Sequence, residues 1–92
     1  MLRIVFTSRM KRDVKRMQKR GKDMRALAAV LDQLARRVPL AEKLRDHALS
    51  GDFTGFRECH IEPDWLLIYQ IDDDELILFA TATGTHADLF AN

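Results

Sequence analysis

The stretch "WLLIYQI", residues 65–71, constrains the fold of this chain more than any other part of the sequence. If it forms a strand, alternate side chains point to opposite faces, and both faces are apolar. Such a strand has to be covered by other elements, and helix is the usual cover of at least one face. The run "WLLIY" is far too short to cross a bilayer. The stretch therefore predicts the central strand of a small sheet, with helix packed against it.

Three further segments have the short apolar pattern of strands: residues 2–6, 53–60 and 75–82. Asp72, Asp73 and Asp74 favour a turn before the last of these strands, and residues 40–52 are expected to form a loop. The segment "FRECHIEPDWLLIY", residues 56–69, reads as a hairpin with two apolar arms around a short turn. These segments give the central strand its neighbours.

A first helix is expected directly after residues 2–6. Thr7 or Ser8 can cap it, because a hydroxyl accepts a hydrogen bond from a free first-turn N–H. Gly21 is a natural terminator. The apolar face of this helix, at helical spacing, consists of Met10, Val14 and Met17.

A second helix begins at Asp23, which can act as its N-terminal cap, and Pro39 stops it. Its apolar residues recur at three- and four-residue spacing, which is the clearest periodicity in the chain. They are Met24, Leu27, Ala28, Leu31, Leu34, Ala35 and Val38. The short connection at Gly21 predicts that the two helices form an antiparallel hairpin.

The resulting order, β-α-α-β-β-β, predicts an α+β fold within one domain, residues 1–92. A small antiparallel sheet carries the N-terminal helical hairpin on one face. The tail "TGTHADLFAN" is expected to be a short, partly ordered segment.

Charge is distributed very unevenly along the chain. Residues 1–46 contain fourteen Lys and Arg against five acids, whereas residues 47–92 contain one Arg against nine acids. A basic half of this strength suggests a polyanionic partner such as RNA, although a solvated helical surface is the alternative. The basic residues expected to contact such a partner are Lys11, Arg12, Lys15, Arg16, Lys19, Arg20, Lys22 and Arg25.

Cysteine usage and the N-terminus bear on localisation. Cys59 is the only cysteine, which excludes an internal disulfide and fits a reducing cytoplasm. The first residues have only a short apolar stretch before a basic run, the reverse of a secretory signal. We therefore expect a cytoplasmic protein without membrane attachment.

All three histidines lie in the second half of the chain: His47 in the loop, His60 at a strand end and His86 in the tail. Histidine can transfer protons in both directions near neutral pH. Cleavage of RNA through its own 2′-hydroxyl needs a base for that hydroxyl and an acid for the departing 5′-oxygen. Histidines with an aspartate, such as Asp64, can supply these transfers without a metal.

Each of these residues also has a purely structural interpretation. A lone histidine on a strand is commonly a hydrogen-bonded structural residue, and Asp64 can cap the turn that follows Pro63. Trp65 can belong to the core. A metal site is disfavoured because the sequence has no HxH or HExxH pair, and no cofactor motif such as a P-loop or GxGxxG occurs. The residues alone therefore indicate a basic α+β domain with three histidines of interest, for which RNA is one candidate partner.

Three segments together resemble YafQ-type toxins of the RelE/ParE superfamily: "DVKRMQKRGKDM", "RDHALSGDFTGFRECHIEPDWLLIY" and "TGTHADLF". The resemblance runs from about residue 5 to residue 90, and the pair "H-x-EPDW-x-LIY" and "TGTH-x-x-LF" is specific. It implies a toxin of a type II toxin–antitoxin system with a RelE-like fold. Such toxins cleave mRNA in the ribosomal A site and are held inactive by a cognate antitoxin.

The resemblance also implies which residues act. It assigns catalytic roles to His47, His60, Asp64 and His86, and mRNA base orientation to Phe90. Trp65, within the same motif, is taken as a further substrate-binding residue. The His60–Asp64 turn then forms one wall of a nuclease site.

One position departs from the family pattern. YafQ-like toxins usually carry an arginine just before "TGTH", where this chain has Ala82. An arginine there could make a bidentate contact to the scissile phosphate, so its loss implies reduced activity. Ala82 is expected to be solvent-accessible, and Arg57 is a candidate to compensate for the missing charge.

Two alternative functions stay open on these grounds. A ParE-like gyrase-inhibiting toxin would share the fold but lack nuclease histidines. A catalytically inactive module that binds the ribosome or RNA is compatible with Ala82. The set of three histidines with Asp64 favours the nuclease.

Overall fold

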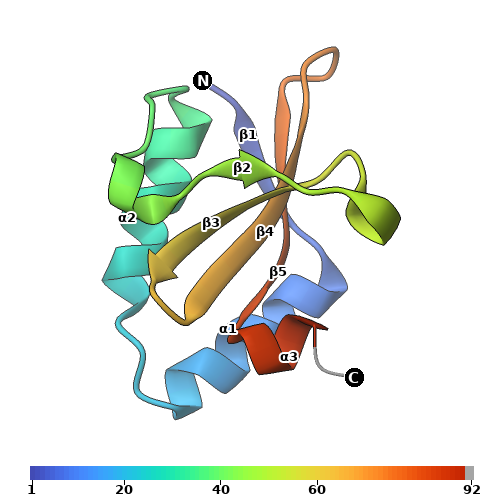
Figure 1. Cartoon of the computed structure of the whole chain (residues 1–92). Helices are drawn as coiled ribbons and strands as arrows, with labels where there is room; N and C mark the ends of the chain where they lie inside the picture. The colour runs from blue at the N-terminus through green and yellow to red at the C-terminus, as the bar shows by residue number, and fades with distance from the viewer. Residues whose placement is uncertain (91–92) are drawn as a thin grey trace.

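The computed structural model describes residues 1–90 (Figure 1). It shows the expected order of elements, with a short strand, a short C-terminal helix and two 3₁₀ turns in addition. The helices are α1 (Ser8–Lys19), α2 (Met24–Ala35) and α3 (His86–Phe90). The strands are β1 (Arg3–Phe6), β2 (His47–Ala48), β3 (Arg57–Glu62), β4 (Trp65–Asp72) and β5 (Ile77–Gly84). Two 3₁₀ turns, η1 (Glu42–Leu44) and η2 (Gly51–Phe53), flank β2.

The five strands form one sheet in the order β1-β5-β4-β3-β2, so the apolar strand β4 is central as predicted. The three hairpin-connected pairs are antiparallel, whereas β1 runs parallel to β5 at the sheet edge. The α+β prediction is confirmed, but the sheet is mixed rather than fully antiparallel. Both helices and three strands separate β1 from β5, and a connection of this length permits parallel pairing.

Two segments expected to be irregular are ordered. The predicted loop, residues 40–52, contains β2, and the tail contains α3; the last two residues of the predicted tail lie outside the described residues. Strand β3 starts at Arg57 instead of residue 53, because Gly51–Phe53 forms a 3₁₀ turn and Gly55 has a φ of 94°.

Both predicted helix starts are confirmed. The Thr7 side chain accepts a hydrogen bond from the Met10 N–H, and the Asp23 side chain accepts one from Arg25. The end of α2 differs from the prediction, because the helix stops at Ala35, before Pro39. Arg37 then adopts a left-handed conformation with φ 59°, and this leaves Val38 46% exposed instead of buried.

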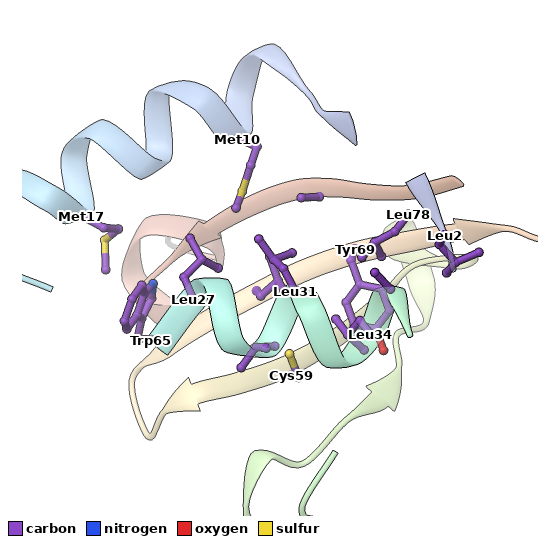
Figure 2. Packing of buried hydrophobic residues seen from close by; sticks show 14 residues of the cluster. Leu2, Met10, Met17, Leu27, Leu31, Leu34, Cys59, Trp65, Tyr69 and Leu78 are labelled. Atoms are coloured by element: carbon purple, nitrogen blue, oxygen red, sulfur yellow. The ribbon is translucent and has the colours of Figure 1, made fainter. Parts of the chain in front are cut away.

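The main core lies between the helices and one face of the sheet (Figure 2). Leu27, Leu31 and Leu34 of α2 point toward the sheet, and Trp65 lies beside Leu27 in this view. The buried residues of this core are Leu2, Met10, Met17, Leu27, Val30, Leu31, Leu34, Ala35, Cys59, Trp65, Leu67, Tyr69, Leu78 and Ala80. Burial raises the pKa of the Cys59 thiol to about 12.

A second, smaller apolar cluster covers the opposite face of the sheet. Its buried members are Leu66, Ile68, Ala82 and Leu89, with Leu49, Phe53, Phe56 and Phe90 packed against them. Strand β4 is therefore buried on both faces, as its sequence requires. None of the helices in residues 1–90 has the length and apolar character that crossing a bilayer requires.

A buried polar network connects α1 to the end of β5. Thr83 has no exposed surface, and its backbone N–H donates to Asp13 at 3.1 Å. Its hydroxyl accepts from the Trp65 indole at 2.9 Å and donates to the Leu66 carbonyl at 2.6 Å. Asp13 is 3% exposed and also accepts from Arg16 at 2.7 Å. Every polar group named here is satisfied, so the network fixes α1 against the sheet.

Asp13→Ala is expected to destabilise the protein by about 1–3 kcal/mol, because the Thr83 N–H would be left buried without an acceptor. Urea denaturation followed by circular dichroism measures the change. Asp32→Ala is the control, since Asp32 forms an exposed pair with Arg36 and its loss should cost under about 0.5 kcal/mol. Equal losses in the two variants would contradict a structural role for this network.

Candidate active site

Three histidines from distant parts of the chain converge on the face of the sheet that lies opposite α1 and α2. His47 lies on β2, His60 on β3 and His86 at the start of α3. The ring centroids of His47 and His60 are 6.4 Å apart, and those of His60 and His86 are 5.6 Å apart. The three imidazoles expected from the sequence therefore form one cluster.

The strand pairing explains which face these side chains occupy. His60 is opposite Leu66 and Glu58 is opposite Ile68, and both partners belong to the small apolar cluster. Because paired residues share a face, His60 and Glu58 project on this side of the sheet. Cys59, between them, points into the main core.

Glu58 is a member of the site that our sequence analysis missed. It is 5% exposed, and its Oε1 lies 3.2 Å from Nε2 of His60 and 3.8 Å from Nε2 of His47. Glu58 and His60 are two residues apart on one strand, so their side chains point to the same face. This spacing could have identified Glu58 from the sequence. The carboxylate connects two of the three rings.

His60 is the most enclosed of the three rings. Its side chain is 13% exposed, compared with 50% for His47 and 55% for His86. Its Nδ1 lies 3.3 Å from the Pro63 carbonyl, and its Nε2 faces Glu58. Both ring nitrogens of His60 therefore lie close to oxygen atoms of the protein.

His86 is held by Asp64, which lies in the turn between β3 and β4. One oxygen of Asp64 accepts from the His86 backbone N–H at 2.8 Å and lies 2.6 Å from Nδ1 of the ring. These two hydrogen bonds lower the pKa of Asp64, the backbone bond more strongly. An ionised carboxylate only accepts, so Nδ1 is the protonated ring nitrogen in this contact.

The short helix α3, which carries His86, is anchored by Asp88. The Asp88 carboxylate accepts from the Thr85 N–H at 2.9 Å and receives two hydrogen bonds from Arg20 of α1, at 2.6 and 3.0 Å. These contacts, chiefly the one from Arg20, hold the pKa of Asp88 well below its ordinary value. A Cβ on Gly84 would lie 2.8 Å from the Asp88 Cβ, so a glycine is required there.

Phe90 ends α3 and lies over the small apolar cluster. Its ring packs edge-to-face against Phe53, with a centroid distance of 5.5 Å. It is partly exposed, which leaves part of the ring available to contact a ligand. Its proposed role in base orientation is compatible with this position.

Three residues expected to bind substrate occupy other environments. Trp65 is completely buried in the main core, so its side chain packs beneath the site and has no surface exposed to a substrate. Arg57 lies on the helix side of the sheet, opposite Tyr69, and its Nε lies 3.3 Å from both Asp46 and the Tyr69 hydroxyl. It faces away from the histidines, so the expectation that it compensates for Ala82 is wrong. Strand alternation places Arg57 and Glu58 on opposite faces.

Ala82 lies on the site face, opposite Ile68, but it is 1% exposed. Our expectation of a solvent-accessible position is therefore wrong. Helix α3 brings Leu89 over this part of the sheet and buries the alanine within the small apolar cluster. A longer side chain here would have to extend past these neighbours to reach the histidines.

The predicted basic surface is divided between internal ion pairs and free charges. Arg16, Arg20, Lys22 and Arg25 pair with Asp13, Asp88, Glu62 and Asp23, respectively. The exposed residues of this set that form no salt bridge with any of residues 1–90 are Lys11, Arg12, Lys15 and Lys19.

A cavity of about 650 Å³ opens beside His60 and His86. Lys43, Leu44 and Arg45 line one side, and Ile61, Glu62 and Pro63 line another. No group of three or more His, Cys, Asp or Glu side chains within residues 1–90 is arranged to hold a metal ion. The site thus offers proton-transfer groups next to an open cavity.

Comparison with known proteins gives a consistent result. Residues 2–91 match the family model described as a bacterial toxin of type II toxin–antitoxin system, YafQ. The mRNA interferase toxin YafQ of Escherichia coli K12 is 43% identical over 88 residues, covering 95% of this chain and 94% of the relative.

Two solved structures are also similar over nearly the whole chain. The crystal structure of the E. coli DinJ–YafQ complex aligns with a TM-score of 0.88 at 40% identity, covering 98% of this chain and 99% of the other. The crystal structure of a metal-bound toxin from Helicobacter pylori aligns with a TM-score of 0.93 at 43% identity, covering 98% and 100%.

Asp88→Asn is expected to lower the melting temperature at neutral pH, with a deficit that shrinks as the pH falls below about 4. The pKa of Asp88 is lower in the folded protein than in the unfolded chain, so its ionised carboxylate stabilises the fold at pH values above the ordinary aspartate pKa. This stabilisation is lost as the pH falls toward the pKa of Asp88 in the folded protein. Melting curves from pH 7 to pH 2 measure the difference. Asp74→Asn, in the exposed β4–β5 turn, controls for loss of one charge. A constant deficit at every pH would contradict the role of the Arg20 pair.

Proposed function

The chain belongs to the YafQ family of type II toxin–antitoxin toxins, and we propose that it is an endoribonuclease that cuts mRNA in the ribosomal A site. The observation that carries this proposal is the convergence of His47, His60 and His86 with Asp64 on one exposed face. The name of its E. coli relative, an mRNA interferase, supports the same activity.

The chemistry proposed is attack of the RNA 2′-hydroxyl oxygen on the adjacent phosphorus. The bond between that oxygen and phosphorus forms as the bond from phosphorus to the 5′-oxygen breaks. The products are a 2′,3′-cyclic phosphate and a 5′-hydroxyl, with one proton removed and one delivered. Two side chains that exchange protons near neutral pH are sufficient for this reaction.

We assign the base to His86 and the acid to His47. Asp64 holds the His86 proton on Nδ1, so Nε2 has a free lone pair and is directed away from the carboxylate. Nδ1 of His47 lies 2.6 Å from the Arg45 carbonyl, and its Nε2 lies 3.8 Å from the Glu58 carboxylate. His60, between the two rings, then holds the substrate or tunes its neighbours.

The ribosome and the antitoxin are proposed to share the basic surface of α1. Lys11, Arg12, Lys15 and Lys19 are exposed cations that can contact ribosomal RNA phosphates. The same charges suit an acidic segment of a cognate antitoxin, and the E. coli relative forms a complex with DinJ. Binding of the two partners would then be mutually exclusive.

His86→Ala is expected to reduce single-turnover cleavage of A-site mRNA on programmed ribosomes by about 10²- to 10⁴-fold, the usual contribution of a proton-transfer residue. The melting temperature should change little, since the ring is half exposed. Asp32→Ala serves as the matched surface control.

Equal rates for the parent and His86→Ala would contradict the assignment of the base. Absence of cleavage by the parent, with ribosome binding intact, would favour the inactive binding module that Ala82 leaves open. A gyrase supercoiling assay tests the ParE-like alternative, and we expect that this protein does not inhibit gyrase.

Ala82→Arg is expected to raise cleavage by about a hundredfold, because it restores a cation for transition-state charge. It should also cost about 1–3 kcal/mol of stability, since Ala82 is buried beneath Leu89. Ala82→Met adds similar bulk without charge, so it should lose stability and gain no activity. Equal cleavage by the two variants would show that the missing charge does not limit the rate.

A further inference from the structure

Lys43 and Arg45 are the cations that face the histidine cluster. Both line the cavity of about 650 Å³, together with His60 and His86. Both are exposed, and neither forms a salt bridge with an acidic group anywhere in residues 1–90. Their charge is available to a ligand in the cavity.

The acidic residue that lines the same cavity does not cancel this charge. The Glu62 carboxylate accepts from Lys22 at 2.8 Å, so its negative charge is already paired. The other titratable groups in the lining are two histidines. The cavity is therefore net positive, and its size is in the range of small-ligand pockets, large enough for one nucleotide.

The backbone of Arg45 connects this charge to the catalytic cluster. Arg45 has a φ of 50°, a left-handed conformation that is costly for a residue with a side chain. In this conformation its carbonyl lies 2.6 Å from Nδ1 of His47. One strained residue thus orients a histidine and places a guanidinium at the cavity.

Two other positions that could bring a cation to this face of the sheet do not do so. Strand β5 carries Ala82 in place of a cation, and Arg57 lies on the opposite face, held by Asp46 and Tyr69. A phosphodiester beside the histidines would have to be neutralised from the η1 side. Arginine suits this task because its planar group can bind phosphate oxygens in pairs, and lysine adds a point charge.

We propose that Lys43 and Arg45 bind an RNA phosphate that flanks the scissile bond, in the cavity that they line together with His60 and His86. This inference rests on the proposed function, because it names the substrate contacts of the same site. It assigns the two residues to substrate positioning, whereas proton transfer stays with the histidines.

The test uses an all-2′-deoxy trinucleotide, which can bind but cannot be cleaved. In NMR titrations of the full chain, its addition should shift the ring signals of His60 and His86. Arg45→Asn should weaken binding about tenfold, and adding Lys43→Ala should weaken it further and flatten the salt dependence. Asparagine is chosen because it tolerates the left-handed conformation, and unchanged His47 ring signals would show that the turn is intact.

Two further variants serve as controls for the binding measurement. Arg45→Lys keeps the charge and should retain most of the affinity. Arg3→Ala removes an exposed cation on β1, at the opposite edge of the sheet from β2, and should bind like the parent. Parental affinity and salt dependence in Arg45→Asn with Lys43→Ala would overturn the proposal, as would failure of the parent to bind.

Cleavage on ribosomes separates this inference from the proposed function. If the parent cleaves mRNA and the double variant has the same kcat/KM, the nuclease assignment stands and the phosphate site is wrong. If the parent binds the trinucleotide through these cations but cuts no mRNA, the phosphate site stands and the nuclease assignment is wrong.

Discussion

Thr83 holds three elements together directly beneath the site. Its hydroxyl connects Trp65 at the start of β4 to the Leu66 carbonyl, and its N–H donates to the buried Asp13 of α1. Only Gly84 and Thr85 separate it from His86. The position of α3, which carries His86, is therefore set by the core, and Trp65 supports the candidate site through this hydrogen bond.

The features of the fold that were predicted correctly, such as the helix starts, depend on contacts between residues close together in the sequence. Thr7 and Asp23 cap their helices because a short polar side chain can satisfy a free N–H within its own turn. The end of α2 was predicted wrongly because it depends on distant residues: Arg37 leaves the helix and pairs with Asp73 in the β4–β5 turn. The pairing of β1 with β5 is likewise a long-range choice.

In the candidate site, too, some features were predicted from the sequence and others required the three-dimensional structure. The resemblance to YafQ-type toxins located the histidines and Asp64, but the environments of Arg57 and Ala82 required the three-dimensional structure. Arg57 faces the helices through strand register, and Ala82 is buried because α3 folds over it. Helix α3 could not be anticipated, since five residues form a stable helix only with outside support, here from Arg20 on α1.

The buried thiol of Cys59 has a consequence for how this protein responds to its surroundings. Oxidants and alkylating agents attack the thiolate, and a thiol that is both enclosed and held protonated presents almost none of it. The sulfur here has the role of a small apolar side chain between the sheet and α2. Thiol-directed oxidants and alkylating agents should therefore react slowly with Cys59 while the protein is folded.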